Sequence, residues 1–231
     1  MPSDEHLARV GGISAIVGVV VLFVASMLHP LDAHPGDAPA AFAEYALDRF
    51  WVATHLGQLL GVVLIATGLV ALSWTLRAGR AGAWALLACL AAVASVSLAG
   101  ALQAVDGVAL KIAVDRWSAS AEGVRAVAFE AAYAVRQVEV GLASVMGAFF
   151  GLTVLLYGTA VLLSPVAPSW LGVFGTLAGL ATVISSVVQA HTGFSDVAMA
   201  TSMPSSLLVL VWSICVGIFL LRTARATHNT A

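Results

Sequence analysis

Six stretches of this chain are each long and apolar enough to cross a lipid bilayer, and they constrain its fold more than any other feature. A helix needs about 20 apolar residues to span the hydrocarbon core. Helices and closed barrels are the only structures that satisfy their backbone hydrogen bonds there. We therefore predict an all-α, six-transmembrane-helix bundle, with residues 1–231 forming a single transmembrane domain. The predicted spans are residues 10–28, 51–76, 83–110, 138–163, 170–190 and 205–221.

The composition agrees with a bilayer as the main solvent. Hydrophobic residues make up 61% of the chain and charged residues only 10%, whereas soluble domains carry about 25% charged residues. The net charge of -2 argues against a nucleic-acid partner, which would require a basic patch. Both cysteines, Cys89 and Cys215, lie inside apolar stretches, so neither a disulfide framework nor a zinc ribbon is expected.

The connections between the spans differ on the two sides of the membrane. One side has short loops, and its segments together hold five bases and two acids, whereas the long-loop side holds five bases and ten acids. Because Lys and Arg close to span ends favour the cytoplasm, we expect a multi-pass protein of the plasma membrane with both termini cytoplasmic. The basic residues of the short-loop side are Arg9, Arg77, Arg80, Arg222 and Arg225.

Two of the long connections have helical character. Asp37 can cap a helix that has Pro39 in its first turn, and Phe42 and Tyr45 would then share one face. The segment 119–137 has a similar apolar periodicity. We expect both to form short interfacial helices on the outer side, or to run straight into the following spans.

The third long connection, residues 191–204, is unusually apolar for a loop. We expect it to fold back over the bundle, with Pro204 starting or kinking the sixth span. Trp51 and Trp117 would mark the outer membrane interface, where aromatic belts form.

Polar side chains gather near the outer ends of the spans. Three helices each present a polar pair separated by three residues, and a single polar residue ends the fifth span. Ionisable groups inside a bilayer cost roughly 2.5–3.5 kcal/mol each at the centre of a helix, so their presence indicates either a site or a structural network. The candidate ligand-binding residues are His55, Gln58, Gln103, Asp106, Arg136, Glu139 and Gln189.

Two interpretations of these pairs follow directly. In the first, Arg136 pairs with a carboxylate and the network only fixes helix register, as in a structural partner subunit of a membrane complex. In the second, the pairs line a pocket for a small or lipid-like ligand, where Arg136 binds an anionic group and His55 and Gln58 orient it. We favour the second, and a homo-oligomer or a membrane partner is compatible with both.

A third interpretation is a transition-metal or haem site. His29, His55 and His191 lie at comparable depths on three helices, and three imidazoles with a carboxylate suit zinc, copper or iron. Two facing imidazoles could also ligate haem. No HExxH, GxSxG or P-loop motif occurs, and we identify no catalytic residue.

Three short motifs carry a resemblance to a known family. They are YAVRQVE at 133–139, LARVGG at 7–12 and PSWLG at 168–172. The chain resembles an uncharacterised bacterial family of six-span membrane proteins, a domain of unknown function, in which an Arg-x-x-Glu element opens the fourth span. The resemblance implies six spans and directs attention to Arg136 and Glu139, but it implies no activity.

Overall fold

The computed structural model describes residues 2–30 and 32–228, which are almost entirely helical and contain no strand. Its elements are, in chain order, α1 (Pro2–Met27), α2 (Ala38–Leu47), α3 (Trp51–Thr75), α4 (Gly79–Gln103), η1 (Ala104–Leu110), α5 (Lys111–Ser118), α6 (Glu122–Leu162), α7 (Ser169–Thr192) and α8 (Asp196–His228). The segment η1 is a π-helix that continues α4 into α5. The predicted all-α class is confirmed.

Six helices of the described chain are long and apolar enough to span a membrane. They are α1, α3, the continuous helix of α4, η1 and α5, and then α6, α7 and α8. Each corresponds to one of the six predicted apolar stretches, to within one residue where a stretch extends past the end of its helix. The protein is therefore a multi-pass membrane protein, as predicted.

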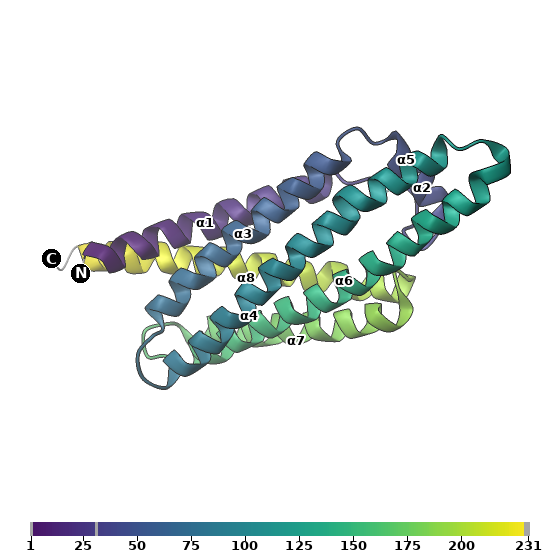
Figure 1. Ribbon diagram of the computed structural model, residues 1–231. Coiled ribbons are helices and arrows are strands. Elements are labelled where there is room, and N and C mark those ends of the chain that lie inside the picture. The colour runs from purple at the N-terminus through teal and green to yellow at the C-terminus, as the bar shows by residue number, and fades with distance from the viewer. Residues whose placement is uncertain (1, 31, 229–231) are drawn as a thin grey trace.

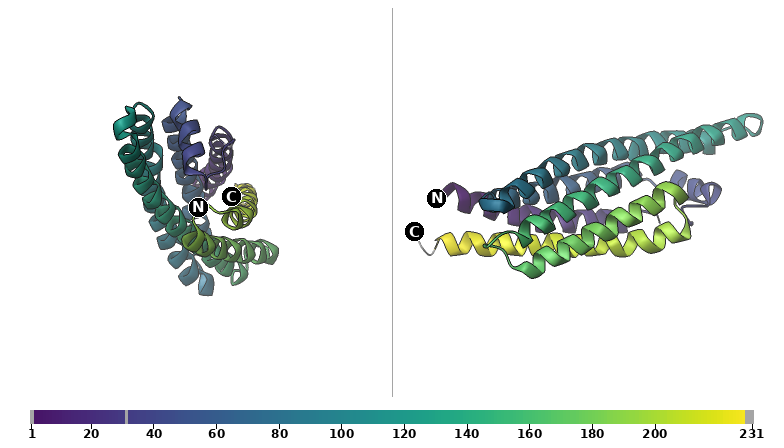
Figure 2. Two further views of the ribbon diagram at one scale, coloured as in Figure 1. Left: turned by 90° about the vertical axis from the view of Figure 1, so that its right-hand side faces the viewer. Right: turned by 90° about the horizontal axis from the view of Figure 1, so that it is seen from below.

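The six spans form a closed ring in which each helix packs on two neighbours. The order around the ring is α1, α3, α4, α6, α7 and α8, and α8 returns to α1. Figures 1 and 2 show both termini at one end of the bundle and α2 and α5 at the other. All long connections therefore lie at one end, and the site residues predicted above lie near that end. We call it the outer end and the opposite one the inner end, as labels that imply no orientation in the membrane.

Glycines allow a close helix crossing between α6 and α7. A Cβ added to Gly151 would lie 2.9 Å from the carbonyl oxygen of Gly179, and one added to Gly158 would lie 2.9 Å from that of Gly172. Small residues at such positions let helix backbones touch in lipid.

Two spans are longer than predicted. The continuous helix from Gly79 to Ser118 has 40 residues and α6 has 41, so each is about 60 Å long, twice the hydrocarbon thickness. Of the two alternatives predicted for residues 119–137, the structure therefore shows the second, because most of them belong to α6 and run straight into the span. Figure 2 shows α5 and the start of α6 projecting as a hairpin beyond α7 and α8.

The short helix α2 is confirmed with its predicted cap. The Asp37 carboxylate accepts a hydrogen bond from the backbone N–H of Ala40, at 3.3 Å, and Pro39 occupies the first turn. Phe42 and Tyr45 are both buried. Their face packs against α5 and α6, which places α2 across the outer end of the bundle.

The prediction for residues 191–204 is wrong in one respect. The segment is not a loop that folds back, because α8 already begins at Asp196 and Pro204 lies inside it. The Ser195 hydroxyl accepts a hydrogen bond from the backbone N–H of Ala198, at 3.2 Å, and so caps this helix.

The two tryptophans predicted at the outer membrane interface are buried within the protein, so they form no lipid-facing aromatic belt. Trp51 is 0% exposed and Trp117 is 9% exposed, because Tyr45 of α2 packs on Trp51, and Phe42 of α2 and Phe129 of α6 pack on Trp117. They belong to an outer apolar cluster of Ala38, Ala41, Phe42, Tyr45, Trp51, Leu110, Val114, Trp117 and Ala132.

Candidate functional site

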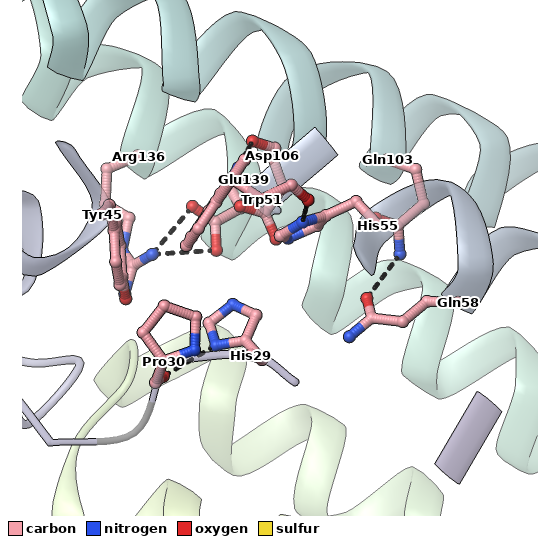
Figure 3. A network of polar contacts seen from close by, with 10 residues as sticks. All are labelled: His29, Pro30, Tyr45, Trp51, His55, Gln58, Gln103, Asp106, Arg136 and Glu139. Carbon is pink, nitrogen blue, oxygen red and sulfur yellow. Dashed lines mark hydrogen bonds and ion pairs between the residues drawn. The ribbon is translucent and has the colours of Figure 1, made fainter. Parts of the chain in front are cut away.

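The predicted polar pairs lie together at the outer end of the bundle, beside the outer apolar cluster (Figure 3). Three helices supply the pairs, and the chain leading to α3 supplies additional aromatic and histidine side chains. We call the whole group the outer polar cluster. Its members are His29, Tyr45, Trp51, His55, Gln58, Gln103, Asp106, Arg136 and Glu139.

The pairs on α3 and on the α4–η1 helix meet each other in two contacts. His55 Nε2 lies 3.1 Å from Asp106 Oδ2, and Gln103 Nε2 donates to Gln58 Oε1 at 3.2 Å. The two helices are antiparallel neighbours, so pairs with the same spacing of three residues match in reverse order. The spacing seen in the sequence is thus explained by pairing between helices.

His55 is held by its own helix. Its ring is 1% exposed, and Nδ1 lies 2.7 Å from the carbonyl oxygen of Trp51. Because a carbonyl only accepts hydrogen bonds, Nδ1 carries a proton. The other ring nitrogen, Nε2, faces the Asp106 carboxylate, but the contact does not have the geometry of a hydrogen bond. Among the described residues, neither His55 Nε2 nor Asp106 Oδ1 has a hydrogen-bond partner.

The π-helical segment η1 positions Asp106 against α3. The indole Nε1 of Trp51 donates to the carbonyl oxygen of Asp106 at 3.0 Å, and this backbone group lies in the irregular turn. A Cβ added to Gly107 would lie 2.6 Å from Cβ of His55, so a glycine is required at this contact. Single π-helical turns inside long helices often occur at functional sites.

The two residues of the third pair, Arg136 and Glu139, bind each other within α6. Arg136 Nη1 donates to both carboxylate oxygens of Glu139, at 3.1 and 3.0 Å. Arg136 is 5% exposed and Glu139 is 4% exposed. Hydrogen bonds between charged partners are stronger than those between neutral groups, and this contact pairs the two buried charges with each other.

Arg136 also ties two outer loops to α6. Its Nη2 donates to the carbonyl oxygen of Pro35 at 3.0 Å and to the hydroxyl of Tyr45 at 3.3 Å. The ring of Phe194 lies 4.5 Å from the guanidinium carbon. Burial raises the pKa of Tyr45, so its hydroxyl stays protonated. Both terminal nitrogens of Arg136 are therefore used inside the protein.

A pocket of about 540 Å³ opens above Arg136. Its walls come from the loop before α2, from α6, and from the turn between α7 and α8. Of the candidate residues named from the sequence, only Arg136 lines it. The lining residues are His34, Pro35, Gly36, Ala38, Tyr133, Arg136, Gln137, Val140, Thr192, Gly193, Phe194, Ser195 and Asp196.

The two loops at the mouth of this pocket are joined directly. His34 Nε2 lies 3.0 Å from Asp196 Oδ1, and the Gly36 N–H donates to His34 Nδ1 at 3.0 Å. A Cβ added to Gly36 would lie 2.9 Å from the carbonyl oxygen of Phe194. Sequence reasoning missed these residues, because they lie 162 positions apart in segments without periodicity.

The predicted metal ligands do not converge. The rings of His29 and His55 are 5.3 Å apart, but His191 is exposed at the end of α7. No group of three His, Cys, Asp or Glu side chains in the described chain has a geometry that could hold a metal ion. Burial lowers the pKa of His29, whose Nδ1 donates to the carbonyl oxygen of Pro30 at 2.8 Å.

Gln189 is the other candidate that stands apart. It is half-buried on α7, and it neither lines the pocket nor forms a side-chain hydrogen bond with the outer polar cluster. The structure therefore assembles six of the seven candidate ligand-binding residues into pairs and leaves Gln189 outside.

Comparison with known families gives a match that begins in α4 and ends in α8. A family model described as a domain of unknown function (DUF4386) matches residues 83–223, more than half of the chain. The match includes α6, with Arg136 and Glu139, and excludes His55. No curated protein and no solved structure matches the chain.

Proposed function

The chain belongs to the DUF4386 family, which has no assigned activity, and we propose from its own geometry that it binds a small-molecule or lipid-like ligand at its outer end. The observation that carries this proposal is the pocket above Arg136. Its volume of about 540 Å³ lies within the range of about 300–1,000 Å³ that is typical of ligand sites. Aromatic, amide and carboxylate groups converge on it, as in other small-molecule sites.

The buried pairs support this pocket from below. Arg136 binds Glu139, the carbonyl of Pro35 and the ring of Phe194, so one guanidinium holds the floor and both loops of the mouth. We assign Arg136 and Glu139 the role of positioning the pocket. His55 and Asp106 lie on the α3 side of the outer polar cluster and outside the pocket lining.

We also propose that the pocket faces the exterior of the cell, in the plasma membrane. The five arginines of the opposite end lie close to span ends, together with both termini, which favours the cytoplasm for that end. Cysteines replacing Ala78 and Ala121, both exposed, test this orientation. A membrane-impermeant thiol reagent added to intact cells should label position 121 only. Labelling of position 78 alone would show that the protein has the opposite orientation in the membrane.

Native mass spectrometry of the gently extracted protein tests the pocket. The wild-type protein should retain a bound small molecule or lipid as a discrete mass increment. Gln137→Trp fills the pocket from α6 and should abolish the increment. Ala134→Trp is the matched control, because Ala134 is exposed on the same helix but does not line the pocket.

Two outcomes would contradict the proposal. A wild-type protein that carries no increment, and whose melting temperature does not change with amines, carboxylates, sugars or lipids, has no such site. An increment that survives Gln137→Trp and Ala134→Trp alike is a ligand bound elsewhere on the protein.

A further inference from the structure

The charges around the pocket decide which ligand it accepts. Arg136 is the cation on its floor, and Glu139 neutralises it through two contacts of 3.1 and 3.0 Å. Because the remaining terminal N–H groups bind Pro35 and Tyr45, an incoming carboxylate or phosphate would have to displace existing partners. The floor therefore attracts no anion, contrary to the role expected for Arg136 from the sequence.

The histidine at the mouth is uncharged in this arrangement. His34 Nδ1 accepts a hydrogen bond from the N–H of Gly36, so this nitrogen carries no proton. The remaining proton lies on Nε2, which donates to Asp196 Oδ1 at 3.0 Å. His34 thus orients the Asp196 carboxylate without neutralising it.

Asp196 therefore contributes an uncompensated negative charge at the mouth of the pocket. Its side chain is 96% exposed, and its Oδ2 has no protein partner among the described residues. The residue lies in the first turn of α8. The whole outer side adds to this potential, because its segments hold ten acids and five bases.

The other groups in the pocket suit an organic cation. Tyr133 and Phe194 present aromatic rings, and Phe194 already lies against one guanidinium, which shows that a cation can approach this ring. The side chain of Gln137 is exposed and makes no hydrogen bond within the described chain. Aromatic faces with one carboxylate are the usual recognition elements for ammonium groups. A metal ion would require more converging ligands than the described residues supply.

We propose that the pocket binds a ligand bearing an organic ammonium group, with Asp196 as its counter-ion and Tyr133 and Phe194 as its aromatic walls. This inference rests on the proposed function and names the ligand class for the same site. A soluble amine and the amine headgroup of an outer-leaflet lipid share this chemistry. With a volume of about 540 Å³, the pocket can hold either a whole soluble amine or the whole headgroup of such a lipid.

Ligand binding to the full-length protein tests the class. In nanodiscs of phosphatidylglycerol, tetramethylammonium, choline and ethanolamine should raise the melting temperature at millimolar concentration. Acetate and phosphate at equal ionic strength should not. Asp196→Asn should weaken the binding of tetramethylammonium at least tenfold, whereas Glu122→Gln, a control at an exposed acid outside the pocket, should leave it unchanged.

A second arm distinguishes the two sources. In nanodiscs that contain equal amounts of phosphatidylethanolamine and phosphatidylglycerol, native mass spectrometry counts the lipids that remain bound. Selective retention of phosphatidylethanolamine, lost in Asp196→Asn, identifies the lipid headgroup as the ligand. No lipid preference together with binding of the free amines identifies a soluble ligand.

Three results overturn the inference. If acetate or phosphate binds in place of the amines and Gln137→Trp abolishes this, the pocket exists but its ligand is an anion. If the amines bind equally well to Asp196→Asn, the carboxylate is not their counter-ion. If no probe binds and no mass increment is retained, the ligand class and the proposed function are both wrong.

Discussion

The outer and inner ends of this bundle are held together by different chemistry. At the outer end, charged groups are buried in pairs, as in Arg136 with Glu139. At the inner end, the buried polar contacts use uncharged groups, namely hydroxyls, carbonyls and the indole N–H of Trp212, which donates to the carbonyl oxygen of Leu171 at 3.0 Å. The Tyr157 hydroxyl donates to the carbonyl oxygen of Leu69 at 2.8 Å and contacts Ser73 Oγ at 2.7 Å, and Ser73 donates to the carbonyl oxygen of Ala85 at 3.1 Å.

The difference follows from what each end must do. A hydroxyl bonded to a carbonyl of a neighbouring helix buries no charge, and such a bond contributes about 0.6 kcal/mol on average in membrane proteins. A buried charge is costly unless it is paired, so a site built from charges needs fixed partners. The outer end accordingly contains the π-helix, the long loops and the pocket. The inner end, in the described chain, has short connections and regular helices.

The largest difference between the two ends should appear when a charge partner is removed. Arg136→Met leaves the Glu139 carboxylate buried without a partner, which should cost about 3–5 kcal/mol of unfolding free energy. Arg136→Met combined with Glu139→Leu should recover part of this loss. Steric-trapping measurements in bicelles give the free energies. Arg116→Met, at an exposed arginine of α5, is the control, and an equal loss there would remove the special role of the pair.

Disturbing the close contact between α6 and α7 should reduce stability by an intermediate amount. Gly151→Val places a side chain 2.9 Å from the carbonyl oxygen of Gly179 and should cost about 1–3 kcal/mol, as overpacked cores do. Gly100→Val is the matched control, because a Cβ there meets nothing within 4 Å. Melting temperatures in one detergent compare the two. If both variants are equally stable, backbone contact at the α6–α7 crossing does not limit stability.

At the inner end, removing a hydroxyl should have a smaller effect. Tyr157→Phe keeps the buried ring and removes the hydrogen bond to Leu69, so it should cost about 0.6–1 kcal/mol. Steric-trapping measurements in bicelles, as for Arg136→Met, allow the two losses of unfolding free energy to be compared directly. A loss as large as that of Arg136→Met would mean that the two ends do not differ in the way described above.

The smallest effect concerns the pH dependence contributed by His29. Burial lowers the pKa of His29 in the folded state below its usual value of 6.5, so the unfolded chain binds the proton more readily. The contribution to stability is therefore complete above about pH 6.5 and decreases as the pH falls below it. His29→Phe should reduce the slope of stability against pH between 6.5 and 5. An unchanged slope of stability against pH in His29→Phe would show that His29 has the same pKa in the folded and unfolded states.

Much of the fold was predictable, because a bilayer forces apolar segments into helices. The start of the third helix at Trp51 and the cap at Asp37 agree with the sequence pattern. The length of α6 was not predictable from apolar content alone, since its first turns contain Glu122, Arg125 and Glu130. Those turns are stable because the outer apolar cluster packs against one of their faces.

The candidate site was predictable only in part. The spacing of His55 with Gln58 and of Gln103 with Asp106 indicated a shared depth, and the structure joins these pairs across two helices. The mouth of the pocket was not indicated by any periodic pattern, because His34 and Asp196 lie at the edges of two loops. Their pairing depends on the closure of the ring between α7, α8 and α1.

The sequence by itself determined the six spans, the polar end and the paired spacing of its side chains. These properties depend on local composition and on the helical repeat, which each segment carries alone. The tertiary structure decided that Arg136 is neutralised by Glu139 and that His34 accepts a hydrogen bond from Gly36. It also decided that one carboxylate oxygen of Asp196 pairs with His34, while the other has no protein partner among the described residues. Charge compensation requires contact within a few ångströms, and such contacts form only when the loops and helices have packed.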